Sequence, residues 1–294
     1  MVHQEGGLEL FDSIKLKFPH LPIFMEIDDN VLSIPPYNQA HEVYSPRSEV
    51  RRRCLEQMRK SDGVIVSTPY LKEIYSEFNS NIHVVPNSIN FKKWDSLKRK
   101  KKPGIRIGWA GGSAHEGDFD EVKDAILGIC KKYPNVKFVL VNGPAANGLP
   151  EWAKGVKQIE HKMMWTPILK YPQMLADLDI DIGISPLVDS AFNRGKSNLK
   201  WLENAALGIP TVAMNVGHFA HTLTHCDTAM LANDSDEFFK HLETLINDRK
   251  LRKEIGNSAR VHAEINFNID ENIKKYCRIL NEGIAKKSGK EALA

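Results

Sequence analysis

The stretch AFNRGKSNLKWLENAALGIPTVAM, residues 191–214, governs how the rest of the chain is interpreted. A polar loop rich in cations leads into residues 199–206, where apolar side chains recur at helical spacing. Gly208 ends this predicted helix, and residues 211–214 have the pattern of a short buried strand. Because the free N–H groups at a helix N-terminus bind anions, the loop and the helix start together predict a phosphate site.

Several side chains of this stretch are candidates for contacts with a phosphorylated ligand. The loop and the first helical turn supply Arg194, Lys196, Ser197, Asn198 and Lys200. Glu203 lies one turn inside the helix, where a helix interior needs no carboxylate, and we interpret it as a hydrogen-bond acceptor for a sugar hydroxyl. The alternative is a solvated helix start with a surface glutamate, and this stretch alone does not choose between the two.

The composition is that of an ordinary soluble globular chain of 294 residues, with 42% hydrophobic and 26% charged residues. This length is enough for two domains. A net charge of +3 is too small to indicate a nucleic-acid partner by itself. The four cysteines are far apart and form no CxxC pair, which predicts neither a zinc site nor a disulfide framework and fits a reducing compartment. Without a long apolar run or a signal-peptide pattern in MVHQEGG, we expect a cytoplasmic location.

Strand patterns alternate with helical patterns along the whole chain, which predicts an α/β fold with parallel sheets. The expected strands are 21–27, 63–67 and 82–86 in the first half, and 105–110, 136–141, 157–160, 181–187, 211–214 and 229–232 in the second. The basic run KRKKKPG at 98–104 separates the halves, and we interpret it as a linker with solvated charges.

Carboxylates follow the first predicted strand. Glu26, Asp28 and Asp29 stand at its carboxyl end, the edge at which open α/β sheets bind ligands. They are candidates to hold an acceptor or a cation, and the alternative is that they only form a turn. Asn87 occupies the turn after the third strand.

Two glycine turns follow strands of the second half. Gly111-Gly112-Ser113 and His115 come after the strand at 105–110, and Asn142-Gly143 after the strand at 136–141. Backbone N–H groups in such turns can approach a phosphate closely. The pattern is neither G-x-G-x-x-G nor a P-loop, and a tight turn that needs positive φ is the alternative.

Three histidines, His218, His221 and His225, are close in sequence. They lack the helical or finger-like context that fixes metal ligands, so we interpret them as loop or core residues and expect no metal.

The order of several motifs resembles one known family. The stretches are MEIDDNVLSIPPYN, DGVIVSTPYLKEIY, VVPNSINFKKW, IRIGWAGGSAHEGDF, LADLDIDIGISPL, the stretch at 191–214 and NDRKLRKEIGNSAR, spread over about residues 20–285. Together they resemble the retaining glycosyltransferases of the GT-B fold (glycosyltransferase group 1, family 4-like). The resemblance implies two Rossmann-like domains facing across a cleft, the C-terminal one for a nucleotide-sugar donor and the N-terminal one for an acceptor.

The resemblance also implies roles for single residues. Glu203 matches the glutamate that hydrogen-bonds the ribose of the donor, and Gly111 with Gly112 match the loop against its diphosphate. Asn87 matches the turn at the domain junction. No tightly bound cofactor or metal is implied, because the nucleotide-diphosphate sugar is a co-substrate and its leaving diphosphate is stabilised by cations and backbone dipoles.

The phosphate-binding charge departs from the family pattern. Relatives often supply an arginine and a lysine after the glycine loop, whereas this loop offers Ser113 and His115. We predict that Lys196, together with the other cations of its loop, supplies the missing charge. His115 and Lys196 therefore join Glu203 as catalytic candidates.

Two further departures concern shape. A second glutamate that many relatives carry eight residues before the first is Gly195 here. The first half has three predicted strands where a full acceptor domain has six or seven. This predicts a shortened N-terminal domain and a homo-oligomer or a partner that completes it.

The expected domains are residues 1–97 on the acceptor side, a basic linker at 98–104, a donor domain at 105–265, and a helix with a tail at 266–294. The leading function is sugar transfer with retention of anomeric configuration. One alternative is the same reaction on a modified base in viral DNA, which the basic run permits. Another is a non-catalytic structural or interaction subunit, which the short first half and Gly195 favour. The donor's base and sugar and the acceptor (glycan, protein or DNA base) stay open.

Overall fold

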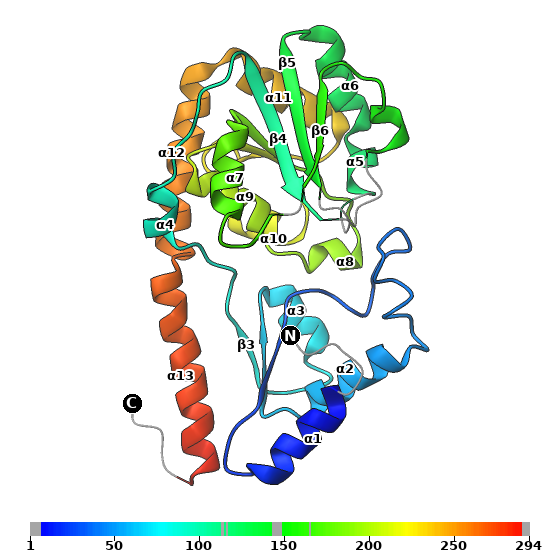
Figure 1. Cartoon of the computed structure of the whole chain (residues 1–294), viewed down its shortest axis with the longest axis vertical. Coiled ribbons are helices and arrows are strands. Elements are labelled where there is room, and N and C mark those ends of the chain that lie inside the picture. Colours follow the sequence, from blue (N-terminus) through cyan, green and yellow to red (C-terminus); the bar gives the residue numbers. More distant parts are fainter. Residues whose placement is uncertain (1–6, 113–114, 116, 143–148, 165, 290–294) are drawn as a thin grey trace.

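The computed structural model describes residues 7–112, 115, 117–142, 149–164 and 166–289. These residues form an α/β structure with two separate parallel sheets, which confirms the predicted fold class. Figure 1 shows the sheets in two parts of the molecule, one above the other, with the last two long helices following one another down one side.

The first sheet has three strands in the order β1-β2-β3. They are β1 (Phe24–Ile27), β2 (Gly63–Val66) and β3 (Ile82–Val84). The central strand β2 is buried along its whole length, whereas only Ile27 is buried in β1. The prediction of a buried strand over 21–27 is therefore wrong in both extent and burial, because an edge strand has one neighbour and keeps part of its surface open.

The helix α1 (Gly7–Lys17) precedes these strands, and α2 (Glu49–Lys60) and α3 (Pro69–Tyr75) connect them. Thr68 caps α3 by accepting a hydrogen bond from the Leu71 N–H at 3.3 Å, with Pro69 in the first turn. At the end of α3 the buried Tyr75 hydroxyl donates to the Asp29 carbonyl oxygen at 2.7 Å. This bond fixes the segment after β1 that carries the predicted acceptor-side carboxylates.

The second sheet has six parallel strands in the order β6-β5-β4-β7-β8-β9. Their bounds are β4 (Ile105–Gly111), β5 (Val136–Asn142), β6 (Ile159–Met163), β7 (Ile182–Ser185), β8 (Thr211–Met214) and β9 (Met230–Ala232). The strand order reverses between β4 and β7. The loops that follow these two strands run to opposite sides and leave a crevice at the carboxyl edge, where open α/β sheets bind ligands.

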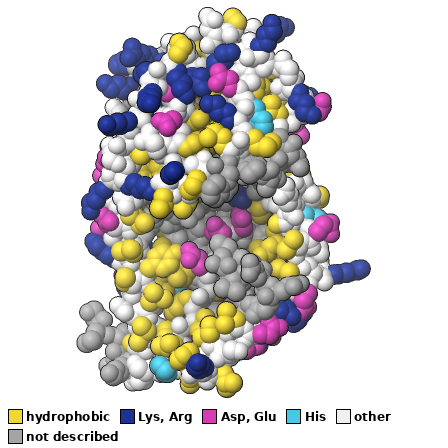
Figure 2. Space-filling view, viewed as in Figure 1, with side chains coloured by type: hydrophobic (Ala, Val, Ile, Leu, Met, Phe, Trp, Pro, Cys, Tyr) yellow, Lys and Arg dark blue, Asp and Glu magenta, His cyan; other side chains and the backbone are white. Residues whose placement is uncertain are grey.

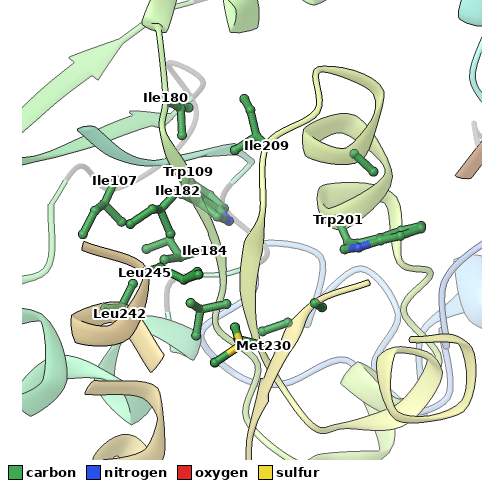
Figure 3. Close-up of a cluster of buried hydrophobic side chains, with 14 of the residues drawn as sticks. Ile107, Trp109, Ile180, Ile182, Ile184, Trp201, Ile209, Met230, Leu242 and Leu245 are labelled. Atoms are coloured by element: carbon green, nitrogen blue, oxygen red, sulfur yellow. The ribbon is translucent and has the colours of Figure 1, made fainter. Parts of the chain in front are cut away.

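Helices cover this sheet on both faces. They are α5 (Asp118–Glu121), α6 (Lys123–Lys132), the 3₁₀ turn η2 (Glu151–Ala153), α7 (Tyr171–Leu178), α8 (Ala191–Arg194), α9 (Leu199–Ala206), α10 (Gly217–Thr222), α11 (Ser235–Asn247) and α12 (Arg249–Asn266). Figure 3 shows Leu242 and Leu245 of α11 on one side of the strands and Trp201 of α9 on the other. All three side chains are fully buried, so the sheet sits between two apolar layers.

The chain passes from the first sheet to the second just after β3. Val85 still packs with the first sheet, whereas Ile89 and the helix α4 (Phe91–Asp95) belong to the core of the second. We propose a domain boundary near residues 86–88, about ten residues before the predicted linker. The helix α13 (Ile269–Lys287) then returns to the first domain.

The basic run is held against the second domain. The Arg99 guanidinium donates to the Ile180 carbonyl oxygen at 2.6 Å, and the Lys102 N–H donates to the carboxylate of Asp179 at 2.7 Å. Asp179 is 1% exposed, and the Lys102 N–H and the nearby cations offset its burial and keep its pKa below the usual range. The interpretation of this run as solvated holds for its exposed side chains at 98–101, but Asp179 at the end of α7 pairs with part of its charge.

Lysine and arginine side chains are not confined to that run. Figure 2 shows more of them on the part of the molecule that holds the second sheet, whereas hydrophobic side chains are common around the first. Within the basic run, Arg99, Lys101 and Lys102 already contact carboxylate or backbone carbonyl oxygens of the second domain.

Candidate functional site

A pocket of about 140 Å³, here called the central pocket, lies where loops from the carboxyl ends of both sheets meet. Its described lining is Asp28, Asp29 and Asn87 from the first domain, and Trp109, His115, Ser185, Pro186, Leu187, Lys196, Ser197, Leu199, Lys200 and Phe219 from the second. Predicted site residues from distant parts of the sequence therefore share one pocket.

The segment before α9, predicted as a loop, contains the short helix α8. The Ser190 side chain caps α8 by accepting from the Asn193 N–H at 3.1 Å, and the helix ends at Gly195. The chain then turns into α9, with Asn198 at the N-cap position. This turn places residues 196 and 197 in the central pocket.

Gly195 lies in a tight contact between the two domains. A Cβ atom there would be 3.0 Å from Leu71 Cδ2 and 3.3 Å from Asn30 Cβ, both in the first domain. Any side chain there, including the glutamate that many members of the resembled family have at this position, would require Leu71 or Asn30 to shift by a few tenths of an ångström. The glycine is therefore explained by packing.

Lys196 bridges the domains inside the pocket. Its Nζ is 2.9 Å from Asp29 Oδ1 and 4.5 Å from the centre of the Phe192 ring. The side chain is only 15% exposed, so this cation is held at the base of the cleft rather than in bulk solvent. An anionic ligand in the pocket would compete with Asp29 for it.

Three hydrogen bonds join the α8–α9 segment to the first domain. They run from Asn87 Nδ2 to Ser197 Oγ (2.8 Å), from Thr68 Oγ1 to the Gly195 carbonyl oxygen (3.3 Å) and from Asn30 Nδ2 to the Ala191 carbonyl oxygen (2.9 Å). The segment predicted to bind the donor is thus also the main polar contact between the domains.

Glu203 is buried and belongs to a polar cluster. Its carboxylate accepts from Lys200 Nζ at 2.8 Å and from the Tyr171 hydroxyl at 3.2 Å. Burial, followed by the charge of Glu203, raises the pKa of Tyr171 to about 12. Burial alone lowers the pKa of Lys200, but Glu203 and Tyr171 more than offset this and raise it. The cluster therefore pairs a buried cation with a carboxylate, and Lys200 lies in the wall of the central pocket.

His115 is held by a fully buried carboxylate. Its Nδ1 is 2.8 Å from Oδ2 of Asp118, whose Oδ1 accepts from the Val188 N–H at 3.0 Å and from Asn193 Nδ2 at 2.6 Å. The imidazole also contacts the Trp109 ring edge-on, with ring centres 5.6 Å apart. Asp118 thereby fixes the ring, and the other ring nitrogen, Nε2, is directed away from this carboxylate.

The glycine turn after β4 does not need positive φ. Neither Gly111 nor Gly112 has a left-handed backbone, so a positive φ does not explain these two glycines. A Cβ on Gly111 would lie 2.3 Å from the Trp109 ring, whereas one on Gly112 would meet nothing within 4 Å. Ser113 and Gly143 lie outside the described residues. Asn142 ends β5 and is buried beside a neighbouring pocket.

Two predicted donor-site residues have other roles in the structure. Arg194 is 52% exposed and makes a bidentate pair with Asp189 at 2.7 and 2.9 Å, lining a separate pocket. The buried Asn198 side chain donates to Thr222 Oγ1 at 3.3 Å. Neither residue lines the central pocket, because α8 and α9 turn their side chains toward α10.

Of the three predicted acceptor-side carboxylates, two line the central pocket and one does not. Asp28 and Asp29 line the central pocket, whereas Glu26 accepts from the Tyr276 hydroxyl of α13 at 2.7 Å. Partial burial and the adjacent Asp29 raise the pKa of Asp28. Glu26 lies within β1 and serves the contact with α13, whereas Asp28 and Asp29 follow the strand at its carboxyl end.

Sequence reasoning missed three residues of the site. Ser185, at the end of β7, has a buried hydroxyl that lines the central pocket without a hydrogen-bond partner among the described residues. Tyr171 and Asp118 hold Glu203 and His115 in place. A signal existed only for Ser185, which ends a predicted buried strand at the ligand-binding edge.

The described residues contain no group of three or more His, Cys, Asp or Glu side chains that could hold a metal ion. His218 is buried in α10, and His225 accepts from the Leu231 N–H at 3.0 Å. Within the same residues, no helix has the length and apolar character needed to cross a lipid bilayer.

Comparison with known proteins agrees with this geometry. The model of a family described as "Glycosyl transferase-like" matches residues 124–278, more than half of the chain. A curated relative, the putative teichuronic acid biosynthesis glycosyltransferase TuaH of Bacillus subtilis (strain 168), is 26% identical over 186 residues. That match covers 58% of this chain and 45% of TuaH, so the chain spans less than half the length of this relative.

Solved structures share the fold. TarM of S. aureus, crystallised as a G117R mutant with fondaparinux, α-GlcNAc-glycerol and UDP, is 16% identical with a TM-score of 0.67, covering 88% of this chain and 50% of TarM. Anabaena HepE, solved with UDP and glucose, is 14% identical with a TM-score of 0.67, covering 93% of this chain and 75% of HepE. The fold is that of the GT-B proteins.

Proposed function

Because the chain belongs to the glycosyl transferase-like family, we propose that it transfers a sugar from a nucleotide-diphosphate sugar to an acceptor with retention of anomeric configuration. The observation that carries this proposal is the arrangement around the central pocket. Lys196 and Lys200 line a pocket at the strand-order reversal, and the carboxylate of Glu203 lies beside it. The structures of TarM and HepE were solved with UDP bound, which supports a uridine nucleotide as the first donor to test.

The ribose, the diphosphate and the sugar of the donor can each be assigned to residues of this arrangement. The ribose hydroxyls bind Glu203, and Tyr171 and Lys200 keep that carboxylate oriented through their hydrogen bonds. The diphosphate lies against Lys196 and the N-terminus of α9, whose free N–H groups and dipole favour negative charge. The sugar then occupies the central pocket, where the Ser185 hydroxyl is available for a hydrogen bond.

The reaction breaks the bond between the anomeric carbon and the β-phosphate oxygen and forms a bond from that carbon to an acceptor oxygen. The acceptor proton passes to the departing diphosphate. Lys196 stabilises the charge that grows on the leaving group, and His115 lies at the sugar end of the pocket, held by Asp118. Asp28 and Asp29 face the pocket from the acceptor side.

A ligand screen tests the proposal directly. Thermal unfolding of the whole chain is measured with UDP, GDP and ADP and with a sugar conjugate of each. We expect one nucleotide to raise the melting temperature, and Glu203→Gln to weaken that shift, because a neutral amide is a poorer acceptor for ribose hydroxyls. Absence of a shift with every nucleotide would refute the donor site and favour a non-catalytic subunit.

The proposal also includes a cellular compartment and an oligomeric state. All four cysteines are unpaired, which supports a reducing compartment such as the cytoplasm. Both outer strands of the first sheet have one strand neighbour among the described residues, so a second copy or a partner that completes this side stays a prediction. Size-exclusion chromatography with light scattering measures the oligomeric state.

A further inference from the structure

A second, larger pocket adjoins the central one. It has a volume of about 400 Å³ and is here called the aromatic pocket. Its wall includes the rings of Tyr37, Trp109, Phe119 and Trp152 and the carboxylates of Asp120 and Glu151. Tyr37 belongs to the first domain and the others to the second, so the pocket spans the interdomain cleft.

The aromatic pocket and the central pocket have two lining residues in common. Trp109 and His115 line both, whereas the third pocket, around Arg194 and His218, shares no described lining residue with the central one. A transfer reaction requires both substrates to meet at one atom. A molecule in the aromatic pocket reaches the central pocket past His115, on the side away from Lys200 and Glu203.

The aromatic side chains are held in place before any ligand binds. Trp152 Nε1 donates to Asp120 Oδ1 at 2.8 Å, and the Trp109 ring stands perpendicular to the Phe119 ring with centres 5.1 Å apart. The Tyr37 ring lies close to Gly117, where a Cβ atom would be only 2.6 Å from it. A pocket with fixed walls loses less entropy when it binds a ligand.

The chemistry of the wall suits a carbohydrate. Aromatic faces pack against the C–H face of a sugar ring, and carboxylates accept hydrogen bonds from its hydroxyls. The described wall contains no lysine or arginine, so it lacks the charge that a diphosphate or a uronic acid requires. A neutral or amino sugar fits this wall, and an anionic one does not.

We propose that the aromatic pocket binds the acceptor, and that this acceptor presents an uncharged or amino-bearing sugar ring to Trp152 and Tyr37. The inference rests on the proposed glycosyl transfer and names its acceptor class. It places the nucleotide at the Glu203 end of the cleft and the acceptor at the Trp152 end, with the transferred sugar between them.

Binding of defined sugars to the whole chain tests the inference. The probes are N,N′-diacetylchitobiose and maltose as neutral sugars, and a hyaluronan disaccharide as an anionic one, titrated by calorimetry with and without UDP. We expect a neutral probe to bind and Trp152→Ala to weaken it by roughly tenfold or more. Tyr70→Ala, an aromatic truncation in the third pocket, is the matched control and leaves binding unchanged.

The outcomes separate the two proposals. UDP binding without binding of any neutral probe, or preferential binding of the anionic probe, overturns the acceptor assignment and leaves the donor site intact. Loss of UDP affinity in Trp152→Ala also overturns it, because the aromatic pocket then holds the nucleotide. Absence of UDP binding refutes the donor site, while the effect of Trp152→Ala on a neutral sugar is still measurable. Trp152→Phe, which keeps an aromatic ring, should retain most of the affinity and excludes misfolding as the cause.

Discussion

Single residues of the α8–α9 segment differ in function although they are adjacent in sequence. Lys196 is 15% exposed in the central pocket, whereas Arg194 is 52% exposed and paired with Asp189 outside it. Both are cations of the same predicted loop, and the sequence gives no reason to prefer one. Because their surroundings differ, the prediction that this loop supplies charge to the phosphates can be tested by comparing a variant of each residue.

Lys196→Ala should reduce kcat/KM for the donor by about 10²–10³-fold, because it removes a partly desolvated charge from the leaving diphosphate. Arg194→Ala should change it by less than about threefold, since that side chain is solvated and already paired. Steady-state kinetics with the nucleotide sugar found in the ligand screen measures both. Equal effects of the two substitutions would contradict a specific role for Lys196 in stabilising the leaving diphosphate.

His218 makes stability depend on pH. Burial, with a smaller effect of His221, lowers the pKa of His218 to about 4, and its Nε2 has no hydrogen-bond partner among the described residues. The unfolded chain binds a proton below about pH 6.5 that the folded chain does not bind. Stability should therefore fall as the pH drops from about 6.5 to 4, by about 2 kcal/mol between pH 7 and pH 5 from this residue.

The control for this prediction is His218→Gln, which removes the titrating group and keeps a polar side chain of similar length. Urea unfolding at pH 7 and pH 5 measures the free energy of both proteins. The variant should lose about 2 kcal/mol less than the wild type over this interval. The same loss in both would show that His218 titrates normally in the folded protein.

At the scale of elements, the turn between α8 and α9 is decided by its contact with the first domain. Its glycine permits the close approach of Leu71 and Asn30, and the approach brings Ser197 to Asn87. The structure thus gives the missing second glutamate a packing explanation. Loss of catalytic function is not needed to account for it.

Gly195→Ala should lower the free energy of unfolding by about 1–3 kcal/mol, because the new methyl group meets Leu71 at 3.0 Å. Gly195→Glu should cost more and should not raise activity, although it restores the family pattern. Gly112→Ala is the matched control for stability, since a Cβ there meets nothing within 4 Å. Thermal unfolding of the three variants measures this, and a neutral Gly195→Ala would contradict the tight contact.

At the scale of the whole molecule, α13 ties the two domains together. It follows α12 of the second domain and packs on the first, where Ile279 contacts the cluster of Ile65 and Val85. Figure 1 shows this helix running beside the lower part of the molecule. The orientation of the domains across the cleft therefore depends on a segment from the other end of the chain.

Ile279→Ala should destabilise the first domain by about 2–4 kcal/mol, because Ile279 is 7% exposed and its removal leaves a cavity between helix and sheet. Ile273→Ala on the same helix is the control, since that side chain is 57% exposed, and should cost less than about 0.5 kcal/mol. Denaturant unfolding followed by circular dichroism measures both. Equal destabilisation would mean that α13 acts through its helicity rather than through this contact.

Much of the fold could be predicted from the sequence. The predictions that were wrong concern elements whose structure depends on long-range contacts. The nine strands were recognised because buried parallel strands are short apolar runs between turn residues. The short helices α4, α8 and α10 were missed, because their few residues carry little periodicity and are stabilised by neighbours. The edge position of β1 could not be read from its composition.

The sequence by itself determined the α/β class, the order of strands and helices, and the group of polar residues at the strand ends, because these follow from local periodicity and turn chemistry. Only the tertiary structure decided which of those residues meet. Lys196 faces Asp29, Arg194 turns outward, and Trp152 lines the aromatic pocket but not the central one. The physical reason is that side-chain direction at a loop or helix start depends on the packing of two domains, and that packing joins residues far apart in the sequence.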